Sequence, residues 1–214
     1  MDIREPLAEL SHTRKIFHSE ADFQFALAWE IQKAYPTAEI RLEYSPAHIE
    51  PRIHIDILVM IGDEWYPIEL KYKTIGFMMT CDGEEYKLKS HVAQDLGRYD
   101  YLKDVQRIER LEQSMPSFKK GYSLLLTNDP AYWNNTNRSD TVYEEFKLSE
   151  NMIKTGRLSW ASHAGKGTIK GREESITLTG KYTICWENYS EFYNERSGIF
   201  KYLILSREAQ RDDN

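Results

Sequence analysis

Asp56, Glu69 and Lys71 are the residues of this chain whose types and spacing best suit a chemical reaction. Two carboxylates held side by side repel each other, and a like-charged pair directly across two strands is destabilising. A bound divalent cation removes that cost, because hard cations such as Mg²⁺ take carboxylate oxygens as ligands. An amine two residues beyond the second carboxylate can orient a water molecule or stabilise developing negative charge. The three residue types therefore suit metal-assisted hydrolysis.

The element that must position these residues is a predicted β-hairpin. Segments 52–60 and 64–72 both alternate apolar and polar side chains, as half-buried strands do. Only Gly62-Asp63 separates them, and a Gly-X pair suits a two-residue turn. A hairpin closed there places the two carboxylates directly opposite each other and His54 opposite Lys71. The alternative interpretation is a solvated sheet face on which Lys71 only neutralises the acidic pair.

Composition limits the class of protein. With 214 residues the chain forms one large domain or two small ones and can bury a core. No apolar run is long enough to span a bilayer, and the first residues lack the pattern of a signal peptide. Cys81 and Cys185 lie far apart, which indicates a reducing, cytoplasmic compartment and gives no zinc site. The net charge of −6 argues against a broad nucleic-acid surface but allows a local basic patch.

The remaining elements follow from caps, breakers and periodicity. Ser19 has the spacing of a helix N-cap, and Pro36 ends the helix that follows near Tyr35. The other predicted elements are a strand at 38–44, a hairpin within 77–88 turning at Asp82-Gly83, a helix at 91–113 closed by Pro116, and strands at 121–127, 182–186 and 200–205. We divide the chain into a lead-in that can be helical (1–17), a core (18–128), a C-terminal extension packed on that core (129–206) and a flexible tail (207–214).

This order of elements resembles the core of the PD-(D/E)XK nuclease superfamily. The residues that carry the resemblance are His54-Ile55-Asp56-Ile57-Leu58 and Ile68-Glu69-Leu70-Lys71, with Ile55 standing where the motif has proline. The resemblance implies a restriction-endonuclease-like α/β (α+β) fold, in which helices flank a central mixed sheet. It implies that Asp56, Glu69 and the Leu70 carbonyl hold Mg²⁺ or Mn²⁺ and that Lys71 positions or activates the attacking water.

Members of this superfamily often carry one more glutamate on the helix before the sheet. Glu20, at the start of the predicted helix, is the first choice for that role and Glu30 the second. Each has a plainer interpretation: Glu20 can complement the helix dipole, and Glu30 can sit at the edge of the apolar stripe.

Two groups of residues are candidates for contact with nucleic acid. Gln94 and Arg98 lie near one face of the helix after the lysine strand, although for Arg98 the favoured interpretation is a solvated, salt-bridged face with Asp104, Arg107, Glu109 and Arg110. Segment 154–181 carries six basic and two acidic side chains, a net charge of +4. There Lys166, Lys170 and Arg172 can grip a phosphate backbone, or the segment can be an ordinary Gly/Lys loop.

The function expected from these residues is metal-dependent hydrolysis of phosphodiester bonds in nucleic acid, with DNA as the expected substrate. A non-catalytic nucleic-acid-binding or assembly protein on the same fold is the main alternative. A hydrolase of small phosphate esters is a weaker one. The sequence leaves open the oligomeric state and the choice between endonuclease and exonuclease.

Overall fold

The computed structural model describes residues 1–47, 49, 53–135 and 140–210. Arg52, which begins the first predicted hairpin strand, and residues 211–214 of the predicted tail lie outside this range. The helices are α1 (Arg4–Thr13), α2 (Glu20–Ala34), α3 (Gln94–Ser114) and the short 3-10 helix η1 (Glu144–Phe146). The strands are β1 (Glu39–Tyr44), β2 (Ile55–Ile61), β3 (Glu64–Lys73), β4 (Phe77–Cys81), β5 (Glu84–Leu88), β6 (Lys120–Thr127), β7 (Ile153–Leu158), β8 (Ile176–Thr183), β9 (Trp186–Glu191) and β10 (Ile199–Glu208).

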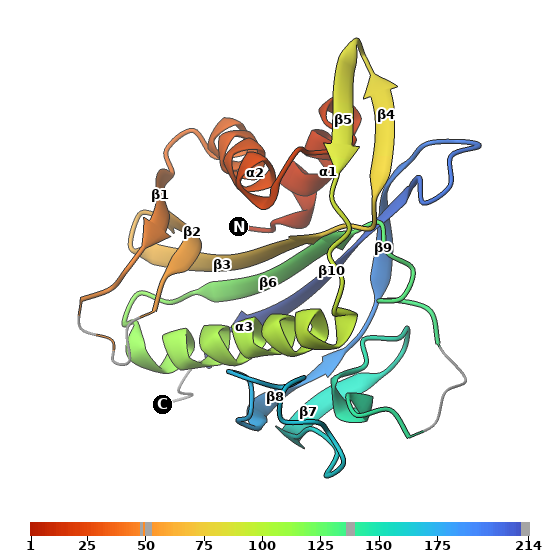
Figure 1. Cartoon of the computed structure of the whole chain (residues 1–214). Helices are drawn as coiled ribbons and strands as arrows, with labels where there is room; N and C mark the ends of the chain where they lie inside the picture. The colour runs from red at the N-terminus through yellow and green to blue at the C-terminus, as the bar shows by residue number, and fades with distance from the viewer. Residues whose placement is uncertain (48, 50–52, 136–139, 211–214) are drawn as a thin grey trace.

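A mixed sheet of six strands forms the centre of the molecule (Figure 1). Its strand order is β1-β2-β3-β6-β10-β9, in which β3 and β6 run parallel and the other neighbours run antiparallel. A parallel pair needs a crossover connection, and α3 supplies it between β3 and β6. The chain is therefore a mixed α/β protein, as predicted, with the sheet flanked by three helices.

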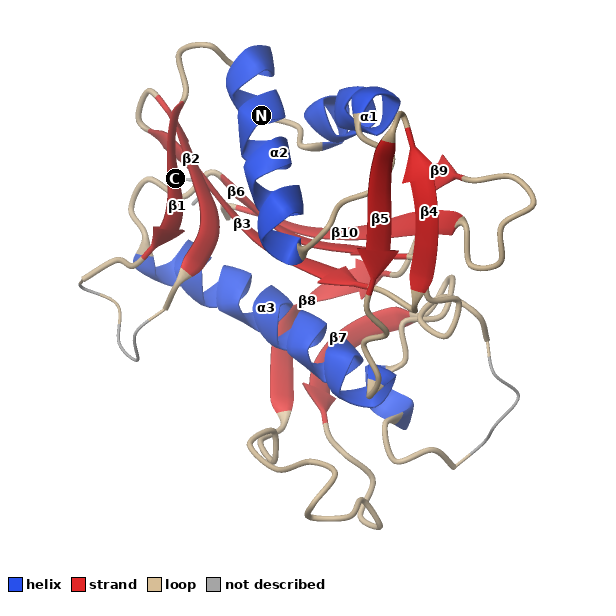
Figure 2. Ribbon diagram, turned by 45° about the horizontal axis from the view of Figure 1, so that its top comes forward, coloured by secondary structure: helices blue, strands red, loops and turns tan. Residues whose placement is uncertain are grey.

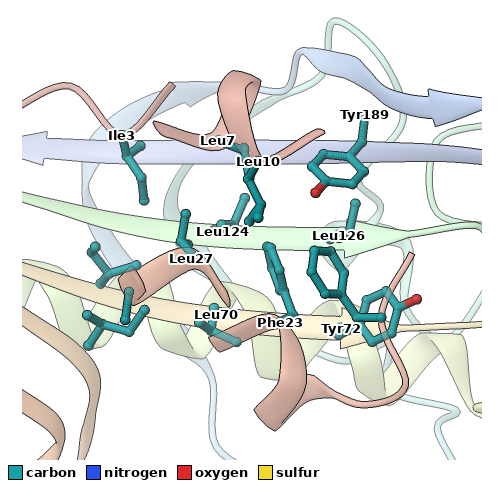
Figure 3. Close-up of a cluster of buried hydrophobic side chains, with 14 of the residues drawn as sticks. Ile3, Leu7, Leu10, Phe23, Leu27, Leu70, Tyr72, Leu124, Leu126 and Tyr189 are labelled. Atoms are coloured by element: carbon teal, nitrogen blue, oxygen red, sulfur yellow. The ribbon is translucent and has the colours of Figure 1, made fainter. Parts of the chain in front are cut away.

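The helices cover opposite faces of this sheet (Figures 1 and 2). On one face, α1 and α2 pack against β3 and β6, and the close-up in Figure 3 shows Phe23 and Leu27 of α2 over Leu70 and Leu124. On the other face, α3 and the β7–β8 hairpin enclose a second buried cluster. The sheet is thus buried on both sides, which a strand of mixed polarity such as β3 tolerates only if its polar side chains find partners.

The start of α2 follows the predicted cap. The Oγ of Ser19 accepts a hydrogen bond of 3.1 Å from the amide of Asp22, and the helix ends at Ala34, two residues before Pro36. The lead-in is helical, as α1. The strand at β1, the β4–β5 hairpin at Asp82-Gly83, the long helix α3 and the buried strand β6 are also confirmed.

The β2–β3 hairpin has the predicted turn, and its strands keep the predicted register over only part of their length. Gly62 has a φ of +57°, which suits glycine, and the ladder runs from Ile61–Glu64 to Ile57–Ile68. It ends there, so the predicted pairing of Asp56 directly opposite Glu69, and of His54 opposite Lys71, is wrong. His54 is instead exposed, with its ring 3.3 Å from the Oγ of Ser45.

The physical reason is a change of direction in β2. The prediction placed Ile53, Ile55, Ile57 and Val59 on one face, but Ile53 and Ile55 pack with α3, whereas Ile57 and Val59 pack under α1 and α2. On β1, Glu43 between the Tyr44–Ile55 and Leu42–Ile57 pairs has a φ of +51°, so the neighbouring strand is irregular at the same level. The part of β2 that is N-terminal to Ile57 is therefore no longer paired with β3.

The C-terminal part contributes to the central sheet itself. The strand predicted at 182–186 is wrong, because β8 ends at Thr183 and β9 begins at Trp186 as the chain passes from the β7–β8 hairpin into the sheet. The predicted tail begins too early: β10 runs to Glu208, and the Nε of Arg207 lies 2.6 Å from the Oε2 of Glu112. Across the described ranges, no helix has the length and apolar character needed to cross a membrane.

Candidate active site

The departure of β2 leaves an unpaired edge on β3. Beyond Ile68 the amides of Leu70 and Tyr72 face away from β6 and would otherwise lack partners. The Oδ2 of Asp56 accepts a hydrogen bond of 2.7 Å from the Leu70 amide, and the Oε2 of Glu20 accepts one of 2.8 Å from the Tyr72 amide. Because the N–H and C=O of one strand residue point to the same edge, the Leu70 carbonyl lies between the two amides. Two carboxylates therefore flank one backbone carbonyl.

Two features of α2 hold these carboxylates. Ser19 caps the helix, so Glu20 begins it and reaches the edge of β3 from the N-terminus. One turn further on, the Nε2 of buried Gln24 donates to the backbone oxygen of Asp56 at 2.6 Å and to the Oε1 of Glu43 at 2.8 Å. Helix α2 thus positions both acids at the place where β2 and β3 separate.

Glu69 and Lys71 meet side chains of α3. The Oε2 of fully buried Glu69 lies 2.6 Å from the Nη1 of Arg107. The Nζ of Lys71 lies 2.9 Å from the Oδ2 of Asp104 and 3.4 Å from the Leu70 carbonyl oxygen. Arg107 also approaches the Oδ1 of Asp104 at 3.1 Å. Helix α3 therefore completes a cluster of alternating charges over β3.

Three carboxylate oxygens of this cluster have no hydrogen-bond partner among the residues that the structure describes. The Oε1 of Glu69 is buried and has no hydrogen bond in the described parts of the chain. The Oδ1 of Asp56 and the Oε1 of Glu20 likewise have no hydrogen-bond partner among the described residues. The other oxygen of each carboxylate accepts from an amide of β3. The Oε1 of Glu69 is the buried one of the three, and a buried acceptor left unpaired costs free energy.

Burial and charge together set the protonation states. Burial raises the pKa of Asp56 to about 6, against the lowering effect of the Leu70 amide and Lys71. Burial, with the nearby Asp104 carboxylate, holds the pKa of Glu69 well above its usual range. Burial alone lowers the pKa of Lys71, but the carboxylates of Asp104 and Asp56 outweigh it and raise that pKa. Lys71 is therefore an ammonium group at neutral pH, whereas the ionised forms of Asp56 and Glu69 are disfavoured.

The cluster has two more negative than positive groups when fully ionised. Glu20, Asp56, Glu69 and Asp104 carry four carboxylates, and Lys71 and Arg107 are the two cations that pair with them inside the cluster. A divalent cation would balance this excess, and hard cations prefer oxygen ligands of these kinds. Asp56, Glu69 and the Leu70 carbonyl are the fitting ligands, with Glu20 beside them. Among the described residues, however, no three His, Cys, Asp or Glu side chains already stand together as a ready metal-binding group.

The predicted alternative glutamate lies away from this site. The Oε2 of Glu30 is 2.7 Å from the Nζ of Lys33 on the same helix, and within the described ranges neither side chain forms a hydrogen bond with β3. Asp104 and Arg107 were missed, because the sequence interpretation assigned them to a solvated face. Asp104 is 3% exposed. Its spacing from Tyr101, Val105 and Ile108 places it inside the apolar stripe of α3, a signal for a buried charge.

The predicted nucleic-acid contacts are not gathered in one place. Arg98 is buried, with its guanidinium 4.7 Å from the ring of Tyr143 and bonded to the Ala131 carbonyl, so it offers no surface to a phosphate. Gln94 donates to the Oδ2 of Asp129 at 2.8 Å. Arg172 forms two hydrogen bonds with Asp100 of α3, at 2.6 and 2.8 Å.

The rest of the basic segment is divided as well. Lys166 and Lys170 are exposed on the connection between β7 and β8. Lys154, counted in its net charge, is buried and donates to the Glu145 carbonyl at 2.7 Å. The positive surface of this segment is therefore smaller than its sequence indicates.

Comparison of the chain with protein-family models, with curated proteins and with solved structures finds no match. The geometry of the residues themselves is therefore the basis for inferring a function.

Proposed function

We propose that this protein is a metal-dependent nuclease that hydrolyses phosphodiester bonds in nucleic acid, with DNA as the expected substrate. The observation that carries the proposal is the edge of β3, where Asp56 and Glu20 flank the Leu70 carbonyl and Glu69 and Lys71 project from the same strand. Oxygen ligands from separate elements converge there with one ammonium group. This combination suits hydrolysis assisted by a hard cation.

The arrangement of elements supports a restriction-endonuclease-like core. Helix α2, strand β1, the β2–β3 hairpin, α3 and β6 follow one another in the order that the sequence resemblance implies. The parallel pairing of β3 with β6 agrees with that core as well. The assignment to the PD-(D/E)XK superfamily is part of the proposal.

Each residue of the cluster has a distinct role in this reaction. Asp56, Glu69 and the Leu70 carbonyl would hold Mg²⁺ or Mn²⁺, with Glu20 acting through water. The bound cation would polarise the reacting phosphate and offset charge on the leaving oxygen. The charged Lys71 cannot accept a proton, so it orients the attacking water and stabilises negative charge. Asp104 acts as a positioning residue, because its ion pair at 2.9 Å fixes the amine of Lys71.

The reaction balances without any further reactant. The oxygen of water forms a bond to phosphorus, and the bond between phosphorus and the leaving sugar oxygen breaks. The attacking water gives up one proton to solvent, and the leaving oxygen takes one up. The products are a phosphate monoester and a free hydroxyl group.

A non-catalytic binding or assembly protein on the same fold is the second candidate. One observation favours it: Arg107 and Lys71 already pair with Glu69 and Asp104, and Asp56 and Glu20 already satisfy amides of β3. In that interpretation the carboxylates only complete the strand edge. The hydrolysis of small phosphate esters is a third, weaker candidate.

A cleavage assay separates the three candidates. Labelled linear DNA, labelled RNA and a small chromogenic phosphodiester are incubated with the protein in Mg²⁺, in Mn²⁺ and in EDTA. The proposal expects shortened or nicked polynucleotide only with metal, and none with Asp56→Ala. Binding without any cleavage would support the second candidate, and turnover of the small ester alone would support the third.

A further inference from the structure

A hollow beside the candidate active site is lined by basic side chains. It has a volume of about 330 Å³ and lies between the N-terminus of α2, the end of β3 and the β4–β5 hairpin. Figure 2 shows α2 and this hairpin standing on the same side of the sheet. The acidic and basic residues that line it are His18, Glu20, Lys73, Lys87, Lys89 and His91.

Three lysines of this hollow are not neutralised. Lys73, Lys87 and Lys89 have no ion pair or side-chain hydrogen bond within the described ranges. Lys87 alternates along β5 with buried Tyr86 and Leu88, and its exposed side chain lies at the wall of the hollow. Unpaired ammonium groups gathered in a concave surface raise the local positive potential, even in an acidic protein.

Each of the two acidic residues near the hollow already has one protein partner. The Oε1 of Glu84 lies 2.8 Å from the Nε2 of His18, whose ring stacks on Tyr86 at 4.4 Å. Glu20 accepts from the Tyr72 amide. Among the described residues, none of the three lysines forms an ion pair with either carboxylate.

His91 adds a neutral donor. Its Nδ1 accepts a hydrogen bond of 3.0 Å from the Thr74 amide, so the proton of the neutral ring lies on Nε2. His91 and Lys73 also line a second hollow of about 350 Å³, which reaches Asp100 and Arg172. The two hollows thus share a wall, and they run from the β4–β5 hairpin to the predicted basic segment.

The hollow adjoins the proposed reaction site directly. Glu20 lines it and also binds the edge of β3 beside the Leu70 carbonyl. Lys73 follows Lys71 by two residues on the same strand. Successive phosphates of a polynucleotide lie a few residues of strand length apart, so a neighbour of the reacting phosphate falls within this hollow.

We propose that Lys73, Lys87 and Lys89 bind the phosphate that neighbours the reacting one on a polynucleotide strand. This inference rests on the proposed function for the position of the reacting phosphate. The β4–β5 hairpin then acts as a clamp for the backbone of the strand. None of the three lysines belongs to the predicted nucleic-acid contacts, which lie on α3 and on the β7–β8 connection.

Salt-dependent binding tests the clamp. Fluorescence anisotropy of labelled single-stranded and duplex DNA is measured in EDTA over a range of salt concentrations. The matched variants are Lys87→Gln/Lys89→Gln, the charge-conserving Lys87→Arg/Lys89→Arg, and, as control, Lys33→Gln, a lysine of α2 that does not line the hollow. Loss of two contacts should flatten the log–log slope by about 1.8 for duplex and about 1.4 for single strands. The arginine variant and the control should keep the wild-type slope.

The outcomes distinguish this inference from the proposed function. Unchanged slopes in the glutamine variant, with cleavage by the wild type intact, would overturn the clamp and leave the nuclease proposal standing. Flattened slopes in a protein that never cleaves would support the clamp and remove the nuclease proposal. A 5′-phosphorylated strand that loses its affinity advantage in the glutamine variant indicates a terminal phosphate in the hollow, and equal affinities indicate an internal one.

Discussion

Asp56 and Glu20 bind consecutive outward-facing amides of one strand, those of Leu70 and Tyr72, at 2.7 and 2.8 Å. The first acid comes from β2 and the second from the start of α2, so the tertiary fold brings them together. Each keeps one oxygen without a protein partner in the described structure. The edge of β3 thus fixes both carboxylates and leaves part of each free for a ligand.

Variants of the two carboxylates and of the lysine should differ in their affinity for a divalent cation. Asp56→Ala or Glu69→Ala should weaken the binding of Mg²⁺ or Mn²⁺ by more than about 100-fold, since even outer-shell changes cost 10–100-fold. Lys71→Ala should leave the affinity largely intact and abolish turnover, because an ammonium group cannot ligate a cation. Isothermal titration calorimetry on the three variants checks this. Loss of binding in Lys71→Ala but not in Asp56→Ala would reverse the assigned roles.

The two candidate glutamates of α2 offer a matched pair. Glu20→Gln keeps an oxygen that can accept from the Tyr72 amide, so the free energy of unfolding should fall by less than about 1 kcal/mol. Turnover should nevertheless fall, because the negative charge is lost. Glu30→Gln should leave turnover unchanged, since that carboxylate pairs with Lys33. Chemical denaturation and cleavage rates of both variants decide, and the opposite pattern would identify Glu30 as the functional acid.

The raised pKa of Asp56 predicts a pH dependence of stability in EDTA. Its pKa is about 6 in the folded chain and 3.8 ordinarily, so the folded state holds more protons between these values. Stability from this group is therefore full below pH 3.8 and is lost as the pH rises through 6. Asp56→Asn should leave the free energy of unfolding unchanged at low pH and raise it by about 1–3 kcal/mol above pH 6. Urea unfolding at pH 4 and pH 7 measures this, and an equal effect at both values would contradict it.

Arg107 should contribute most to the stability of the folded protein when no metal is present. Arg107→Met leaves the buried Glu69 without its cation and should cost about 1–3 kcal/mol in EDTA. Added Mg²⁺ should recover part of that loss by binding the same carboxylate. Lys103→Met on the same helix removes only an exposed pair with Glu174 and should cost less than about 1 kcal/mol. Thermal unfolding with and without Mg²⁺ checks both, and equal losses in the two buffers would argue against metal at Glu69.

Local signals in the sequence predicted most of the fold and part of the site. The Ser19 cap, the Gly62 and Asp82-Gly83 turns and the stop at Pro36 act within a few residues, and the structure confirms them. The boundary between β8 and β9 escaped prediction, because Tyr182 to Trp186 alternates smoothly although the chain changes sheets there. Long-range pairing alone determines that break.

The site depends on such a long-range feature. Periodicity predicts a straight β2 with Asp56 opposite Glu69, whereas packing of Ile55 against α3 turns the strand away. The error changes the partner of Asp56 from a carboxylate to the Leu70 amide. Asp104 was missed for a related reason: its pairing with Lys71 joins residues far apart in the sequence.

Metal-dependent cleavage tests the central claim most directly. Single-turnover release of label from end-labelled DNA is measured at saturating Mg²⁺ for the wild type, Asp56→Ala and Lys71→Ala, with EDTA as the metal-free condition. The proposal predicts cleavage by the wild type only with metal, and a loss of at least about 100-fold in each variant, the usual contribution of one catalytic group. The absence of metal-dependent cleavage by the wild type, or cleavage at the wild-type rate by Asp56→Ala, would contradict it.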